Sequence, residues 1–156
     1  MSLPADLIAH RTDDPKPEDY QELWALLRAY NVQQVGHCAP WPFAVLLRDP
    51  HGMKMAGGVW GFSLWGSFYV DMLVAPDGRR GHGLGGDLLD EAEVEACNRG
   101  CHIIWLDTFA FQARPFYEAR GYREFGRLNG PTPMFPRFFM VKDLQQDLDM
   151  VTGLYS

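Results

Sequence analysis

The sequence predicts a single α/β domain over residues 1–156, with a mixed central β-sheet flanked by helices. Apolar segments separated by tight turns between Ala44 and Val74 predict three consecutive antiparallel strands. A helix follows, and then an uninterrupted apolar strand at His102–Leu106, which is typical of a buried strand that pairs in parallel after a crossover. The sheet is therefore expected to begin as an antiparallel meander and to continue with a parallel crossover.

The two ends of the chain carry weaker signals. Asp6–Arg11 is predicted as a short strand. Pro17 suits the first position of a helix, where its missing N–H would be unpaired anyway, and that helix is expected to end near Asn31. A second short helix and then a loop are expected over Val32–Pro42. Residues 143–156 are expected to form a C-terminal tail, for which a helix and a frayed end both remain open.

Turn and capping residues set the other boundaries. The remaining strands are predicted at Ala44–Asp49, Lys54–Phe62, Phe68–Val74, Arg123–Leu128 and Arg137–Lys142. A helix at Leu84–Arg99 is expected to end at Gly100. Its buried face is expected to consist of Leu88, Leu89, Ala92 and Ala96. A further short helix is expected to end at Gly121, in a left-handed conformation, with Tyr122 packing back on it.

Composition narrows the classes of function. A net charge of -6 and a pI near 5.2 argue against a protein that binds nucleic acids or membrane surfaces. They fit a protein with a cationic substrate better. No apolar run is long enough to span a bilayer, and no secretory signal is expected. The 3 cysteines have no framework spacing, which suggests reduced thiols in the cytoplasm. No metal site is predicted, because Cys97, Cys101 and His102 lack a fourth ligand.

A basic, glycine-rich stretch at Arg79–Gly86 lies between a predicted strand and a predicted helix. Glycines let the main chain turn tightly and approach a ligand closely. The first turn of a helix offers unpaired N–H groups and the positive end of the helix dipole, which together attract a phosphate. The stretch is therefore predicted to bind the pyrophosphate of a phosphorylated cofactor.

The same stretch allows a second interpretation. Gly81–Gly86 matches G-x-G-x-x-G, and Asp107 ends the next strand about 20 residues on, as a dinucleotide-binding fold requires. Two features argue against that fold. Residues Pro76–Arg80 separate the strand from the glycines, and the motif follows antiparallel strands instead of opening a parallel sheet.

Two motifs resemble those of the GNAT N-acetyltransferase superfamily. Arg80–Gly85 is similar to the R-x-x-G-x-G/A signature, and Phe116–Tyr122 is similar to the segment F-Y-x-x-x-G-F/Y. With the strand order, the resemblance covers Ala44–Lys142. It implies a GNAT-like fold, acetyl-CoA as co-substrate, and transfer of the acetyl group to a primary amine of a small molecule or peptide by direct attack in a ternary complex.

The resemblance also implies a set of cofactor contacts. Main-chain groups of Leu73, Val74 and Ala75 would run beside the pantetheine arm, where the family's two central strands part. The pyrophosphate would be held by Arg80, Gly81, His82, Gly83, Leu84, Gly85 and Gly86. Many members carry an Asn shortly before the tyrosine helix. This chain has Gln112 in that region, which either replaces the Asn contact or caps the helix.

Catalytic candidates are a phenol and a carboxylate. The family places a Tyr near the sulfur, so Tyr117 is expected to protonate the leaving thiolate, although a core aromatic residue fits the spacing equally well. Asp71 interrupts an apolar strand and Asp107 ends the next one, so either could accept the amine proton or hold the cation. Asp71 is preferred, with a solvated strand position as the structural alternative.

Two other classes of function remain open, a non-catalytic acyl-CoA-binding module and a dinucleotide-binding oxidoreductase. The identity of the acceptor amine and the existence of a homodimer are not determined by the sequence.

Overall fold

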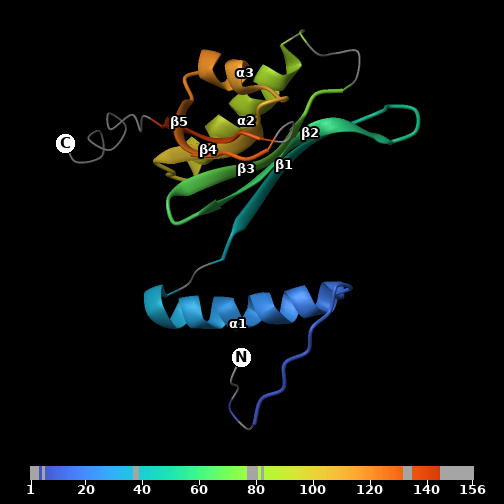
Figure 1. Ribbon diagram of the computed structural model, residues 1–156. Coiled ribbons are helices and arrows are strands. Elements are labelled where there is room, and N and C mark those ends of the chain that lie inside the picture. The colour runs from blue at the N-terminus through green and yellow to red at the C-terminus, as the bar shows by residue number, and fades with distance from the viewer. Residues whose placement is uncertain are drawn as a thin grey trace, which may run out of the picture. The chain divides into compact units, whose positions relative to one another are not determined.

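The computed structural model describes residues 4, 6–36, 39–76, 81, 83–131 and 135–144. The chain divides into two compact units, Met1–Ala39 and Pro40–Ser156, which are drawn in Figure 1. The single domain expected over residues 1–156 stays a prediction. Most of the predicted C-terminal tail lies outside the described residues.

The first unit contains one long helix, α1 (Pro17–Val35). Proline occupies its first turn as predicted, and the Lys16 N–H donates to the Asp19 carboxylate at 2.7 Å. The helix continues past Asn31 and ends at Gly36, whose φ is 79°. The second short helix expected after Asn31 is therefore wrong, because those residues form the last turn of α1. The short strand expected at Asp6–Arg11 is also wrong, because the structure pairs no strand with these residues.

The second unit is built on a six-stranded sheet of order β1-β2-β3-β4-β6-β5. Its elements are β1 (Trp41–Arg48), β2 (Met55–Leu64), β3 (Ser67–Val74), α2 (Leu84–Asn98), β4 (Ile103–Phe109), α3 (Arg114–Ala119), β5 (Arg123–Leu128) and β6 (Arg137–Asp143). The first three strands pair antiparallel, β3 and β4 pair in parallel, and β6 lies antiparallel between β4 and β5. The predicted mixed sheet with a meander and a parallel crossover is confirmed.

Local turn chemistry accounts for most boundaries. Trp65 and Gly66 both have positive φ, 48° and 75°, which is the geometry of a two-residue hairpin between β2 and β3. Gly100 and Gly121 also have positive φ, 70° and 88°, and end α2 and α3 as predicted. Tyr122 packs back and is 3% exposed.

The core lies between the sheet and α2. Leu88, Leu89, Ala92 and Ala96 are buried on α2, as predicted. They pack with residues on one face of the sheet, among them Phe68, Val70, Ile104, Leu106 and Met140. Tyr117 of α3 joins the same cluster, and Figure 1 shows α2 and α3 on the same side of the sheet. Both helices are therefore held against one face.

The strands β3 and β4 part halfway along their length. Their parallel pairing runs from Ser67 and Ile103 to Val70 and Leu106, and stops there. Beyond that point β3 remains paired with β2 up to Val74, and β4 remains paired with β6. The two strands therefore follow different neighbours and open a gap in the sheet.

A bulge lies at the point where the strands part. Gly61 of β2 pairs with Val70 and Trp60 pairs with Met72, so that Asp71 is the extra residue of β3. A Cβ at Gly61 would stand 2.4 Å from the main-chain oxygen of Tyr69, and this close approach explains the glycine. The bulge breaks the alternation of β3, and both Asp71 and Met72 are exposed.

Candidate functional site

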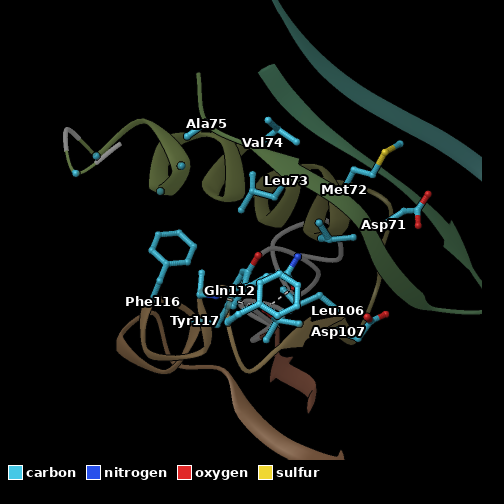
Figure 2. Close-up of a pocket in the computed structure, with 18 residues that line it drawn as sticks. Asp71, Met72, Leu73, Val74, Ala75, Leu106, Asp107, Gln112, Phe116 and Tyr117 are labelled. Atoms are coloured by element: carbon cyan, nitrogen blue, oxygen red, sulfur yellow. Dashed lines mark hydrogen bonds between the residues drawn. The ribbon is translucent and has the colours of Figure 1, made fainter. Parts of the chain in front are cut away.

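A pocket of about 990 Å³ opens where β3 and β4 part (Figure 2). Of the predicted site residues, the following line it: Asp71, Leu73, Val74, Ala75, Gly81, Gly83, Gly85, Gly86, Gln112 and Tyr117. Leu84 does not line it and is half-buried at the start of α2. Arg80 and His82 lie outside the described residues. The structure thus brings the end of β3, the start of α2 and the helix α3 together around one cavity.

The glycine turn has the conformation and the free space that an anion site requires. Gly81 and Gly83 have φ values of 80° and 86°, and a Cβ at either would meet nothing within 4 Å. Gly83 precedes the first helical residue, and its main-chain oxygen accepts the N–H of Gly86 at 2.8 Å. The N–H groups of Leu84 and Gly85 have no acceptor among the described residues. These groups and the positive end of the α2 dipole are available to a phosphate.

The free edge of β3 forms one wall of the pocket. From Met72 to Val74 the strand pairs with β2 on one side and has no partner on β4. Such an edge can pair with an extended ligand as a strand would, and an N–H at its start can polarise a carbonyl oxygen. The splayed arrangement that the sequence could not show is therefore present, whereas the pantetheine contacts stay a prediction.

Tyr117 lies in the core and also lines the pocket. Its side chain is 8% exposed and packs edge-on against Phe116 and Tyr122, with ring centroids 5.0 and 5.9 Å away. Its hydroxyl has no hydrogen-bond partner in the part of the chain that the structure describes. Burial, and then the charge of Asp107, raise the pKa of Tyr117 to about 12. The phenol therefore stays protonated at neutral pH and can donate a hydrogen bond into the pocket.

The two candidate carboxylates differ in their surroundings. Figure 2 shows both at the end of the pocket away from Ala75. Asp107 accepts the hydroxyl of Tyr69 at 3.0 Å and Nε of Arg137 at 2.7 Å. Asp71 is exposed and has no ion pair among the described residues. Asp107 is therefore held by an ion pair and a hydrogen bond, whereas Asp71 has neither among the described residues.

Gln112 does not cap α3, whose N-cap is Ala113 and has no side-chain cap hydrogen bond, and takes a different structural role. Its Oε1 accepts the N–H of Phe109 at 2.8 Å and the hydroxyl of Thr108 at 3.2 Å, which closes the turn between β4 and α3. A contact from its amide nitrogen to a cofactor stays a prediction. Thr108 and Phe111 also line the pocket and were not predicted. Their place at the end of the buried strand β4, with Thr108 inside the strand and Phe111 two residues after it, was the signal that could have indicated them.

The described residues bear on three other features: a metal-binding group, a membrane-crossing helix and a dinucleotide-binding sheet. They contain no group of His, Cys, Asp or Glu side chains that could hold a metal ion. None of the helices in these residues is long and apolar enough to cross a membrane. The sheet order, with its antiparallel first half, is not that of a doubly wound dinucleotide-binding fold.

Comparison with known proteins supports the interpretation of the two motifs. A family model described as an acetyltransferase (GNAT) domain matches residues 41–124. An acetyltransferase of Agrobacterium fabrum is 34% identical over 105 residues, which cover 67% of this chain and 75% of that protein. A blasticidin-S acetyltransferase of Streptomyces morookaense is 36% identical over 92 residues, which cover 58% of this chain and 68% of that protein.

Solved structures show the same fold. A protein from Agrobacterium tumefaciens has 27% identity and a TM-score of 0.80, covering 88% of this chain and 99% of that one. An acetyltransferase from Bacillus cereus has 27% identity and a TM-score of 0.69, covering 86% and 98%. Together with the parted strands, the glycine turn and the tyrosine helix, these matches show that the chain is an acyltransferase of the GNAT acetyltransferase family.

Proposed function

We propose that this protein transfers the acetyl group of acetyl-CoA to a primary amine of a small molecule or peptide. The observation that carries the proposal is the continuous pocket that joins the glycine turn, the free edge of β3 and Tyr117. Its volume of about 990 Å³ lies at the upper end of the range of ligand pockets, which suits a long cofactor arm.

The residues present fit acetyl-CoA at both ends. The turn at Gly81 and Gly83, with the N–H groups of Leu84 and Gly85 that follow it, would hold the pyrophosphate. The unpaired edge of Leu73–Ala75 would hold the pantetheine arm. Bound acetyl-CoA would supply the activated acetyl thioester.

Tyr117 would donate a hydrogen bond during the transfer, and Asp71 would accept a proton. With a pKa of about 12, the Tyr117 hydroxyl is a weaker acid than an ordinary thiol, so its first contribution would be a hydrogen bond to negative charge that develops on sulfur. Asp71, at the far end of the pocket, would accept the proton of the acceptor ammonium group. The two residues would thus act on opposite sides of the transfer in a ternary complex.

The acceptor is proposed to be a small cationic amine. The exposed carboxylate of Asp71 and the net charge of -6 favour a cation. One relative acetylates blasticidin S according to its name, which supports a small-molecule acceptor for this chain as well. The odd number of cysteines, 3, supports a cytoplasmic location, where thiols stay reduced.

A thiol-release screen tests the proposal. The purified protein is incubated with acetyl-CoA and a panel of amines that differ in charge and size, and free CoA thiol is measured. Thiol release with at least one amine, and a rise of the melting temperature with acetyl-CoA but not with a nicotinamide cofactor, are the expected results. A rise of the melting temperature without thiol release from any amine would instead indicate a binding module that has lost turnover.

A further inference from the structure

A single arginine bridges the two helices that border the pocket. Arg120 follows the last residue of α3, one turn after Tyr117. Its Nη2 donates to the main-chain oxygen of Gly86 at 3.2 Å and to the carboxylate of Asp90, both on α2. This contact, here called the Arg120 bridge, connects the first two turns of α2 with the helix that carries Tyr117.

Gly86 provides the space for this bridge. It is buried and helical, so its conformation is one that alanine would also adopt. A Cβ at this position would stand 2.5 Å from Nη1 and 3.1 Å from Cζ of Arg120, well inside van der Waals contact. Gly81 and Gly83 differ, because both have positive φ and open surroundings. A side chain at position 86 would therefore displace the guanidinium of Arg120, whereas Gly81 and Gly83 are explained by the turn.

The surroundings of Arg120 connect it to the pocket. Its guanidinium lies 5.8 Å from the ring centroid of Phe116, which lines the pocket together with Gly86 and Tyr117. Its Nε is buried and has no hydrogen-bond partner among the described residues. An unpaired buried donor opposes burial of the group, so the contacts to Gly86 and Asp90 must hold the guanidinium in place.

We propose that Arg120 is a positioning residue, which keeps the glycine turn at the start of α2 at a fixed distance from Tyr117 on α3. The inference rests on the proposed function, where the turn and Tyr117 contact opposite ends of one ligand. A ligand held at both ends binds and reacts well only if the two contacts keep their separation. Loss of the Arg120 bridge should therefore weaken the binding of CoA and slow turnover, while the KM for the amine stays unchanged.

Calorimetric titration with CoA and steady-state kinetics test this on the full chain. We expect Arg120→Ala to raise the Kd for CoA about tenfold, which is a loss of about 1.4 kcal/mol of binding free energy. Arg120→Lys should recover part of this loss, since lysine keeps the charge without the planar fork. Arg123→Ala is the matched control, because Arg123 forms an exposed ion pair with Asp143 at 3.2 Å.

A double-mutant cycle separates the two explanations for Gly86. Gly86→Ala should displace the guanidinium and raise the Kd as much as Arg120→Ala does, and the double variant should bind CoA no more weakly than Arg120→Ala alone. If the increases in Kd of the two single variants multiply in the double variant instead, Gly86 contacts the ligand independently of Arg120 and the proposal is overturned. Gly86→Ala also covers the case in which Arg120→Ala does not fold, because alanine favours the helix.

The outcomes distinguish the inference from the function on which it rests. Unchanged CoA binding and turnover in Arg120→Ala would overturn the role of Arg120 and leave the acetyltransferase proposal intact. Failure of the unaltered protein to bind CoA would overturn both.

Discussion

Replacing Tyr117 by phenylalanine removes one hydroxyl and leaves the ring in the core. The ring is 8% exposed and packs between two other aromatic rings, and these contacts do not involve the oxygen. Since the hydroxyl has no hydrogen-bond partner among the described residues, its removal leaves none of their polar groups without a partner. We expect the free energy of unfolding to change by less than about 1 kcal/mol.

The effect on turnover should be far larger. The pKa of Tyr117 is about 12, so at pH 8 only about one molecule in ten thousand carries the phenolate. The wild-type hydroxyl therefore remains a donor across the working range, and its loss should lower kcat by about 10²–10³-fold, the usual cost of removing one hydrogen-bond donor to charge that develops in the transition state. The reduction should be the same from pH 6 to pH 9, because Tyr117 does not titrate there.

The assay follows thiol release at saturating acetyl-CoA and acceptor, with CoA affinity measured separately by calorimetry. Tyr122→Phe is the matched control, because the Tyr122 hydroxyl donates to Glu93 at 3.1 Å and does not line the pocket. That variant should lose stability and keep kcat. If Tyr117→Phe has the wild-type kcat at every pH, the phenol has no part in the reaction and its proposed role is refuted.

Three further predictions follow from the same geometry. Asp71→Asn should lose the acidic limb of the pH profile of kcat, and a profile that keeps this limb would exclude Asp71 as the base. The pKa values of Tyr69 and Tyr117 are raised to about 12, so the folded state holds protons that the unfolded chain releases near 10. The free energy of unfolding should therefore fall as pH rises from about 10 to about 12, and urea titrations that show no fall over this range would contradict it. Gln112→Ala should cost about 1 kcal/mol by freeing the N–H of Phe109, whereas Gln112→Glu, which keeps the acceptor oxygen, should not, as chemical denaturation would show.

Features that depend on near neighbours in the chain were predicted well. Gly100 and Gly121 end their helices because only a residue that tolerates positive φ suits those positions, and both do so in the structure. The buried face of α2 follows from the helical spacing of its apolar residues. The glycine turn and Tyr117 were likewise identified from short motifs. Their meeting in one pocket is a property of the fold.

Predictions near the N-terminus failed for a related reason. Asp6–Arg11 has a pattern that suits a strand, but a strand requires a partner, and a local pattern does not show whether an edge is available. The length of α1 was underestimated because no strong breaker stands between Asn31 and Gly36.

The sequence by itself determined the order of elements from β1 onward, the glycine turn, the tyrosine helix and the family to which they point, because each depends on residues that are neighbours along the chain. The tertiary structure decided where β3 and β4 part, which of Asp71 and Asp107 is held by Arg137, and that Arg120 lies against Gly86. Arg137 lies 30 residues from Asp107, and Arg120 lies 34 residues from Gly86. Such contacts exist only after the chain has folded, when the packing of the sheet and helices brings the partners within reach.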